Sequence, residues 1–462
     1  MKKIFVSLLL LIIINVPSFS QSVSGDWSGE LEVNGIKLPL VFHIQQNGDS
    51  LSATMDSPAQ GAKDIKVDKT TFSLNELLME LKSLGANYKG ILAGDSISGT
   101  FSQMGMKFPL TLKKGRVEAK EPNRPQMPKP PFDYNIEDLS FINQTEGNTL
   151  AGTLTTPKNK KNFPVVVMIT GSGSQDRDET LMGHKPFWVI ADYFTKNGIG
   201  VLRMDDRAVG GSSKGKEGAT SADFATDIDA AVSFLKSRGY KNIGLTGHSE
   251  GGMIAPIVAT KNKDVKFLVV MAGPGIPIDR LMELQTYWVV KSSGATEQAA
   301  KKSAEDNKVI YDFMKNYRGN HLQQDLEPFV LEALKKSDET KKLPDDQIKM
   351  MANQQTKILS SPWFEYFIKF NPQDYLSKLK MPILAINGSL DVQVTPKENL
   401  EGIRQALKKA GNKKSEIIEL AGLNHLFQEA KTGAPSEYSQ IEQTISPKAL
   451  EIMTNWILKQ KK

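Results

Sequence analysis

The chain has 462 residues, of which 39% are hydrophobic and 24% are charged, a balance typical of a folded globular protein rather than a disordered or membrane-embedded one. It contains no cysteine, which excludes disulfide bonds, thiol catalysis and anchoring through a lipid-modified cysteine. The formal net charge of +6 is spread along the chain without a dense basic block, so we do not expect a nucleic-acid partner.

The first 20 residues are typical of an export signal. Lys2 and Lys3 precede an apolar run from Ile4 to Val16, and small residues follow before Gln21. This run is shorter than the roughly 20 residues that span a bilayer, which favours cleavage before Gln21 over an uncleaved anchor. We therefore expect export to the periplasm or the cell exterior, with no membrane span after cleavage.

Residues 21–115 predict a β-rich domain. Short apolar runs alternate with turn signals, among them the hairpin dipeptide Asn47-Gly48. We expect a small antiparallel barrel or sandwich. Four aromatic residues fall on the expected strands: Trp27, Phe42, Tyr88 and Phe101. They belong either to the core of this domain or to a surface that binds envelope glycans or a partner protein.

Residues 116–135 are rich in proline and charge, which predicts a semi-rigid linker. From residue 136 to residue 462, apolar strands alternate with helices. The expected strands are 163–170, 199–206, 243–246, 265–273 and 382–388, and the expected helices include 186–198 and 221–239. This order is typical of an α/β fold whose mostly parallel sheet is covered on both faces. Between 276 and 378 the alternation stops, and mostly helical sequence predicts an inserted cap.

The sequence Gly-His-Ser-Glu-Gly at 247–251 follows an expected strand and precedes an expected helix. The pattern G-x-S-x-G in this setting makes a sharp strand-to-helix turn, which exposes the serine hydroxyl beside a helix N-terminus. We predict that Ser249 is a nucleophile.

A serine hydroxyl needs a positioned base, and in folds with this turn the chain order is serine, acid, histidine. Two histidines follow Ser249. His321 falls in the predicted cap, whereas His425 falls in the loop expected after the last strand of the sheet. We therefore predict that His425 is the general base.

Asp391 directly follows the expected strand 382–388, and it precedes the histidine loop by one helix and one strand. In that position its carboxylate would orient the imidazole of His425. Glu398 and Glu401 are nearby competitors, but both fall within the following helix.

The tetrahedral intermediate of such a reaction needs two backbone N–H donors, an oxyanion hole. One donor should be Glu250, the residue after the nucleophile. The other should come from the glycine-rich loop 170–179, and we predict Ser172. The alternative for this loop, a phosphate-binding site, lacks the Gly-Lys-Ser/Thr that would follow.

Two further groups of residues have simpler interpretations. A charged cluster contains Asp176, Arg177, Asp178, Asp205 and Asp206. It has no histidine, and pairing between arginine and aspartate explains it, so we expect no metal and no cofactor. An aromatic group in the expected cap contains Trp363, Phe364 and Phe367. It either lines an acyl pocket or packs the cap against the core.

The segments 170–179, 183–213, 247–252, 360–367 and 387–400 together resemble bacterial α/β-hydrolases, and among them the EstD-like esterases. The resemblance spans nearly the whole chain after residue 20. One departure is Ala208, where the related turn usually has glycine after the arginine. The resemblance implies an α/β-hydrolase fold with an N-terminal β-rich domain, and hydrolysis of small or short-acyl carboxylic esters without a cofactor. It also places Ser249, Asp391 and His425 in a catalytic triad.

The same motifs are also similar to those of serine aminopeptidase-type hydrolases. A peptidase would use the same triad and would need a carboxylate near the nucleophile for the substrate amine, for which Glu250 is a candidate.

Overall fold

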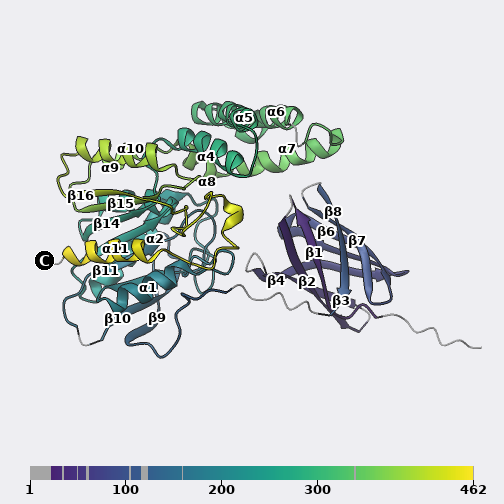
Figure 1. Ribbon diagram of the computed structural model, residues 1–462, viewed down its shortest axis with the longest axis horizontal. Helices are drawn as coiled ribbons and strands as arrows, with labels where there is room; N and C mark the ends of the chain where they lie inside the picture. Colours follow the sequence, from purple (N-terminus) through teal and green to yellow (C-terminus); the bar gives the residue numbers. More distant parts are fainter. Residues whose placement is uncertain are drawn as a thin grey trace, which may run out of the picture. The chain divides into compact units, whose positions relative to one another are not determined.

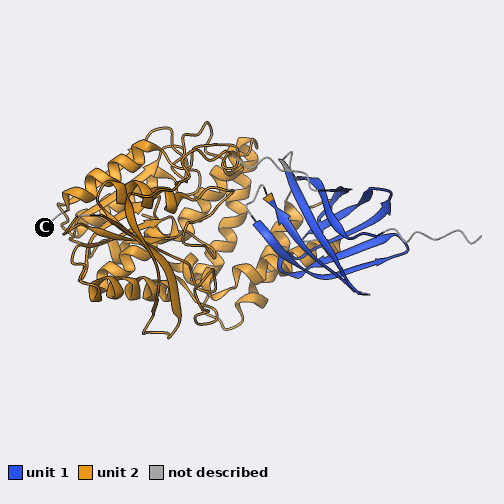
Figure 2. Ribbon diagram, turned by 90° about the horizontal axis from the view of Figure 1, so that it is seen from below, with its two compact units in different colours: residues 1–57, 62–118 blue, residues 58–61, 119–462 orange. Residues whose placement is uncertain are grey.

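The computed structural model describes residues 22–33, 36–48, 50–58, 62–103, 106–115, 123–158, 160–337 and 340–460. The predicted signal peptide, residues 1–20, lies outside these ranges. The chain divides into two compact units, one with residues 1–57 and 62–118 and the other with residues 58–61 and 119–462 (Figure 2).

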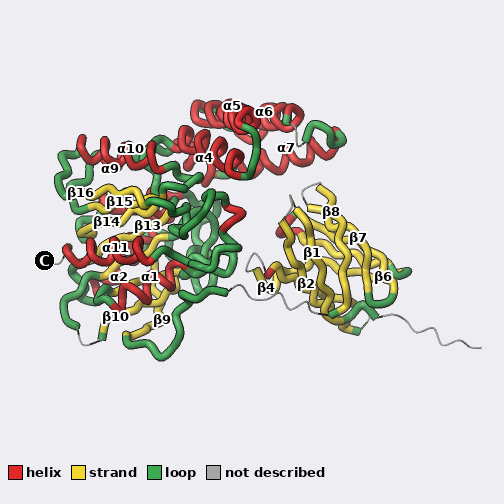
Figure 3. Tube along the Cα trace, viewed as in Figure 1, coloured by secondary structure: helices red, strands yellow, loops and turns green. Residues whose placement is uncertain are grey.

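The first unit is a closed barrel of eight antiparallel strands, each paired with its neighbour in sequence, and β1 also pairs with β8 (Figure 3). The strands are β1 (Gly25–Val33), β2 (Ile36–Asn47), β3 (Ser50–Ser57), β4 (Ala62–Ser73), β5 (Glu76–Leu81), β6 (Ala86–Ala93), β7 (Ser96–Gln103) and β8 (Met106–Lys114). The turn between β2 and β3 contains Gly48 at a φ of +62°, as the hairpin dipeptide predicts.

Side chains fill the barrel. The aromatic residues named above are all at most 2% exposed: Trp27, Phe42, Tyr88 and Phe101. The buried Tyr88 hydroxyl donates to the carbonyl oxygens of Ile97, at 2.9 Å, and Leu110, at 3.2 Å. These aromatic rings therefore form the core of the barrel, and they supply no binding surface.

The second unit contains an eight-stranded sheet in the order β16-β15-β14-β13-β11-β12-β10-β9. Its strands are β9 (Tyr134–Ile142), β10 (Thr149–Pro157), β11 (Val165–Ile169), β12 (Gly200–Met204), β13 (Ile243–His248), β14 (Val265–Met271), β15 (Ile383–Gly388) and β16 (Ser415–Leu420). Strands β11 to β16 pair in parallel, whereas β9 and β10 are antiparallel. The mostly parallel sheet is as predicted, and β9 begins within the predicted linker.

Helices cover both faces of this sheet (Figure 1). The helices α1 (Pro186–Lys196) and α11 (Pro447–Lys459) belong to the core that contains Val166 and Met168 of β11. The helices α2 (Ser221–Ser237), α3 (Glu250–Lys261) and α10 (Pro396–Lys409) belong to the core that contains Val165 and Val167. Successive residues of a strand point to opposite faces of the sheet, and here helices cover each face. The strand residues of both faces are therefore buried, which explains the uninterrupted apolar runs in the sequence.

Between β14 and β15 the chain forms a helical segment, which we call the α4–α8 segment. It contains α4 (Ile278–Ser292), α5 (Glu297–Asn316), α6 (Leu322–Lys336), α7 (Asp345–Leu359) and α8 (Pro362–Lys369), and the short α9 (Gln373–Leu376) follows it. Among the described residues, no helix combines the length and the apolar character that crossing a membrane requires.

The described part of the predicted linker before β9 is attached to the second unit by side-chain hydrogen bonds. The guanidinium of Arg124 donates to the carbonyl oxygens of Met182, Ser439 and Ile441 at 2.9 to 3.0 Å. The side chain of Gln126 bonds to the backbone of residues 444–445. Polar side chains thus hold this stretch of the predicted semi-rigid linker in place, which composition alone does not indicate.

Ala208, the departure noted in the sequence, lies in the loop after β12 with a φ of +62°. This left-handed conformation costs an alanine roughly 1–2 kcal/mol because its Cβ approaches the following carbonyl oxygen. Alanine therefore occupies a position whose backbone favours glycine.

We predict that Ala208→Gly raises the free energy of unfolding by about 1 kcal/mol, because glycine adopts positive φ without this crowding. The matched control is Ala230→Gly within helix α2, which should lower the free energy of unfolding by about 1 kcal/mol. Urea denaturation of the two variants measures both effects. A destabilised Ala208→Gly protein would contradict the assignment of strain to this residue.

Candidate active site

Ser249 lies at the sharp turn between β13 and α3, with φ +52° and ψ −116°. The glycines on either side allow the turn. A Cβ on Gly247 would lie 2.1 Å from the carbonyl oxygen of Gly251, and a Cβ on Gly251 would lie 2.2 Å from that of Ile169. The strained conformation at Ser249 therefore depends on close backbone contacts that only glycine permits.

His425 and Asp391 lie in two loops at the same end of the sheet, and their side chains are in contact. His425 Nδ1 lies 2.8 Å from Asp391 Oδ2, and both residues are buried. The other carboxylate oxygen of Asp391 accepts the backbone N–H groups of Gln393, at 2.8 Å, and Val394, at 2.9 Å. The carboxylate is held on both sides, so it sets the orientation of the imidazole and leaves Nε2 for the substrate side.

Ser249 and His425 line one cavity of about 320 Å³, which we call the catalytic cavity. The α4–α8 segment contributes to its wall through Leu281, Met282 and Gln285 of α4, and Trp363, Phe364 and Phe367 of α8. The structure thus brings together the predicted nucleophile, the predicted base and the aromatic group, and Asp391 lies behind His425. The alternatives His321, Glu398 and Glu401 do not line this cavity.

The two predicted oxyanion donors are Glu250 and Ser172, and both residues line the catalytic cavity. Neither backbone N–H donates a hydrogen bond to any of the described residues. The preceding N–H, that of Gly171, is occupied, because it donates to Glu179 Oε1 at 2.7 Å. The arrangement leaves the N–H groups of Ser172 and Glu250 available for a substrate oxygen.

The carboxyl group of Glu250 is buried and accepts several donors. It accepts the Ser221 hydroxyl at 2.6 Å and the indole N–H of Trp363 at 2.9 Å, and it also hydrogen-bonds to the Ser172 side chain. Burial raises the pKa of Glu250. The side chain of Glu250 therefore holds the glycine-rich loop that contains Ser172, the other predicted oxyanion residue.

Sequence reasoning missed a buried pair that connects three loops. His248 Nδ1 lies 3.0 Å from Glu179 Oε1, and His248 Nε2 lies 3.0 Å from the carbonyl oxygen of His425. Burial opposes protonation of His248, but the charge of Glu179 and its hydrogen bond outweigh burial and raise the pKa of His248. The pair links the nucleophile turn, the glycine-rich loop and the histidine loop. The motif treats residue 248 as variable, so no sequence signal marks this role.

Within the charged cluster, Arg177 donates to Asp205 at 2.6 Å, whereas Asp178 pairs with Arg203, which lies outside the predicted cluster. Asp206 differs, because it accepts the Thr170 hydroxyl and the Gln175 N–H, each at 2.9 Å. Burial raises the pKa of Asp206 to about 7. Among the described residues, no group of three or more histidine, aspartate or glutamate side chains is arranged to hold a metal ion.

A mostly parallel sheet with a strained serine at a strand-to-helix turn and a histidine–aspartate pair nearby defines a class of serine hydrolases. In agreement, residues 164–430 match the family model of the alpha/beta hydrolase fold. The chain belongs to this family.

A search of curated proteins finds Esterase EstD of Thermotoga maritima, which is 27% identical to this chain over 317 residues. The match covers 68% of this chain and 66% of that esterase, slightly less than two thirds of its length.

Solved structures give weaker likenesses. The esterase Pf2001 of Pyrococcus furiosus is 17% identical, with a TM-score of 0.43, and the match covers 74% of this chain and all of that one. The alpha/beta hydrolase GrgF of Penicillium sp. sh18 is 16% identical, also with a TM-score of 0.43, over 71% of this chain and 99% of that one. At these low values the two likenesses add no argument about function.

The pKa of Asp206 predicts a pH effect on stability. Its ordinary value is 3.8 and its value in the fold is about 7. Between these values the folded protein keeps a proton that the unfolded chain has lost. The free energy of unfolding therefore falls as pH rises, by at most about 1.4 kcal/mol per pH unit.

Asp206→Asn should flatten this dependence between pH 5 and pH 7, and thermal unfolding across that range measures it. An identical slope in wild-type and variant protein would contradict the raised pKa.

Proposed function

We propose that this protein is a serine ester hydrolase that cleaves small carboxylic esters through an acyl-enzyme on Ser249. One observation carries the proposal. Ser249, His425, Glu250 and Ser172 all line the same cavity, and the backbone N–H groups of Glu250 and Ser172 donate to none of the described residues. Nucleophile, base and oxyanion donors are the groups that acyl transfer requires.

The reaction follows from this arrangement. Ser249 Oγ attacks the ester carbonyl carbon while His425 Nε2 accepts the hydroxyl proton. The carbonyl oxygen becomes an oxyanion held by the two N–H groups. Asp391 stabilises the imidazolium through Nδ1. The tetrahedral intermediate collapses, the C–O bond to the alcohol breaks, and His425 returns its proton to the leaving oxygen. Water then cleaves the acyl-enzyme by the same steps.

The state of Glu250 favours an ester over an aminoacyl substrate. A peptidase that binds a substrate amine needs a carboxylate with free acceptor capacity. The Glu250 carboxyl instead accepts donors from Ser221, Trp363 and Ser172, and its pKa is raised. These features suit a structural group better than an ammonium-binding one.

We propose that the α4–α8 segment acts as a cap over the catalytic cavity. The support is that α4 and α8 both contribute side chains to its wall. We also propose that the protein is exported, and this part rests on the residue pattern of the first 20 positions alone.

We predict that Ser249→Ala abolishes both ester turnover and labelling by a fluorophosphonate, because no hydroxyl remains to attack carbon or phosphorus. Aryl acetate hydrolysis and peptide mapping of the label measure the two losses, and circular dichroism controls for folding. Undiminished ester turnover by pure Ser249→Ala protein would refute the mechanism.

Asp391→Asn should lower kcat by about 10³- to 10⁴-fold with little change in KM, because an amide holds the wrong tautomer of His425. The matched control is Asp374→Asn in the short helix α9, which does not line the catalytic cavity and should leave kcat unchanged. Equal kcat values for wild-type and Asp391→Asn protein would remove Asp391 from the proposed triad.

A further inference from the structure

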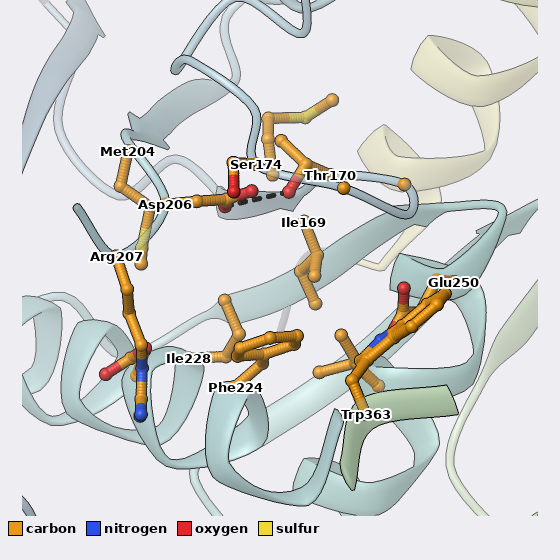
Figure 4. A pocket seen from close by; sticks show the side chains of 15 residues that line it. Ile169, Thr170, Ser174, Met204, Asp206, Arg207, Phe224, Ile228, Glu250 and Trp363 are labelled. Carbon is orange, nitrogen blue, oxygen red and sulfur yellow. Dashed lines mark hydrogen bonds and ion pairs between the residues drawn. The ribbon is translucent and has the colours of Figure 1, made fainter. Parts of the chain in front are cut away.

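A second cavity of about 270 Å³ adjoins the catalytic cavity, and we call it the inner cavity. Gly171, Glu250 and Trp363 line both, so these residues form a shared wall. Figure 4 shows Trp363 and Glu250 at one end of the inner cavity, opposite Met204 and Arg207. Neither Ser249 nor His425 lines it.

The lining of the inner cavity is mostly apolar. Aliphatic and aromatic side chains come from the sheet and from α2 and α3, among them Ile169, Met204, Phe224, Ile228 and Ile254. In Figure 4, Phe224 and Ile228 lie across the space from Thr170 and Asp206. Such a lining binds hydrocarbon by removing it from water.

The charged groups of this lining are already engaged within the protein. Asp206 accepts donors from Thr170 and Gln175, and Arg207 pairs with Asp227 and Glu146. A charged ligand would have to displace these internal partners, at the cost of leaving buried groups unpaired. An uncharged aliphatic chain would displace none of them.

The chemistry of the catalytic cavity decides which part of an ester faces the inner cavity. The leaving alcohol receives its proton from His425, so it must lie on the His425 side of the reacting carbon. The acyl group points elsewhere. Beyond Glu250, one of the two predicted oxyanion residues, lies the inner cavity, since Glu250 lines both cavities.

We propose that the inner cavity binds the acyl chain of the ester as an unbranched aliphatic chain of medium length, and that Trp363 controls entry to it. The inference rests on the proposed esterase function and extends it to a substrate class. The indole N–H of Trp363 bonds to Glu250 at 2.9 Å, and the ring stacks on Phe367 with centroids 5.2 Å apart. This hydrogen bond holds the ring in the shared wall.

The volume sets the length of the chain. The inner cavity, at about 270 Å³, equals roughly nine water molecules at about 30 Å³ each, and a methylene group is of similar size. Octanoate esters should therefore fill it, whereas acetate esters should not reach beyond the catalytic cavity.

The test compares kcat/KM for aryl octanoate and aryl acetate in the full-length protein, with active sites counted by fluorophosphonate titration. Ile228→Trp fills the inner cavity from α2 without touching the catalytic cavity, and it should lower the octanoate-to-acetate ratio by about tenfold or more. The matched control is Ile142→Trp at a position that is 53% exposed, which should leave the ratio unchanged. If Ile228→Trp protein has no titratable serine, Ile228→Phe takes its place.

A second variant, which should raise the octanoate-to-acetate ratio instead of lowering it, tests the role of Trp363. Trp363→Phe keeps an aromatic ring but removes the hydrogen bond to Glu250, and it should raise the ratio by a few fold. An unchanged ratio in titratable Ile228→Trp or Ile228→Phe protein would overturn the acyl site, and a lower ratio in Trp363→Phe would overturn the control of entry. Wild-type protein with neither labelling nor acetate turnover would instead refute the esterase function on which the inference rests.

Discussion

The backbone conformation of Ser249 is the constraint on which the rest of the site depends. A positive φ at a non-glycine residue persists only where surrounding contacts enforce it. Here the enforcement comes from the close approach of β11, β13 and α3, which Gly247 and Gly251 make possible. The result places Ser249 and Glu250 side by side in the wall of the catalytic cavity. The eight-stranded sheet and its two helical layers can be understood as the support for this turn.

Buried acidic groups join the loops that this turn must face. Glu179 connects the N–H of Gly171 to His248, and His248 continues to the histidine loop through the carbonyl oxygen of His425. Glu250 likewise joins α2, α8 and the glycine-rich loop. Burying an acidic group costs free energy unless the group is hydrogen-bonded or ion-paired. Removing one partner therefore leaves a buried group unpaired and destabilises the fold. The loops are therefore positioned relative to one another by interactions that take no part in the proposed chemistry.

The helical segment between β14 and β15 gives the site its shape. Its helix α8 contributes Trp363 to the walls of both cavities, and an aromatic side chain at that position separates two spaces of similar volume. On the proposed mechanism the reacting carbon lies near this wall, with the alcohol on the His425 side. In the proposed acyl site, specificity then depends on side chains of α2 and α8, none of which belongs to the triad.

The sequence by itself determined the class of fold and the candidate triad. Near-continuous apolar runs specify buried parallel strands, and the turn at 247–251, the position of Asp391 after a strand and that of His425 after the last strand are local patterns. It did not reveal the roles of His248 and Glu179, the docking of Arg124 and Gln126, or the inner cavity. Each depends on contacts between residues distant in the chain, and only packing decides those contacts. Local periodicity sets which face of a strand or helix is buried, whereas the tertiary structure decides what that face meets.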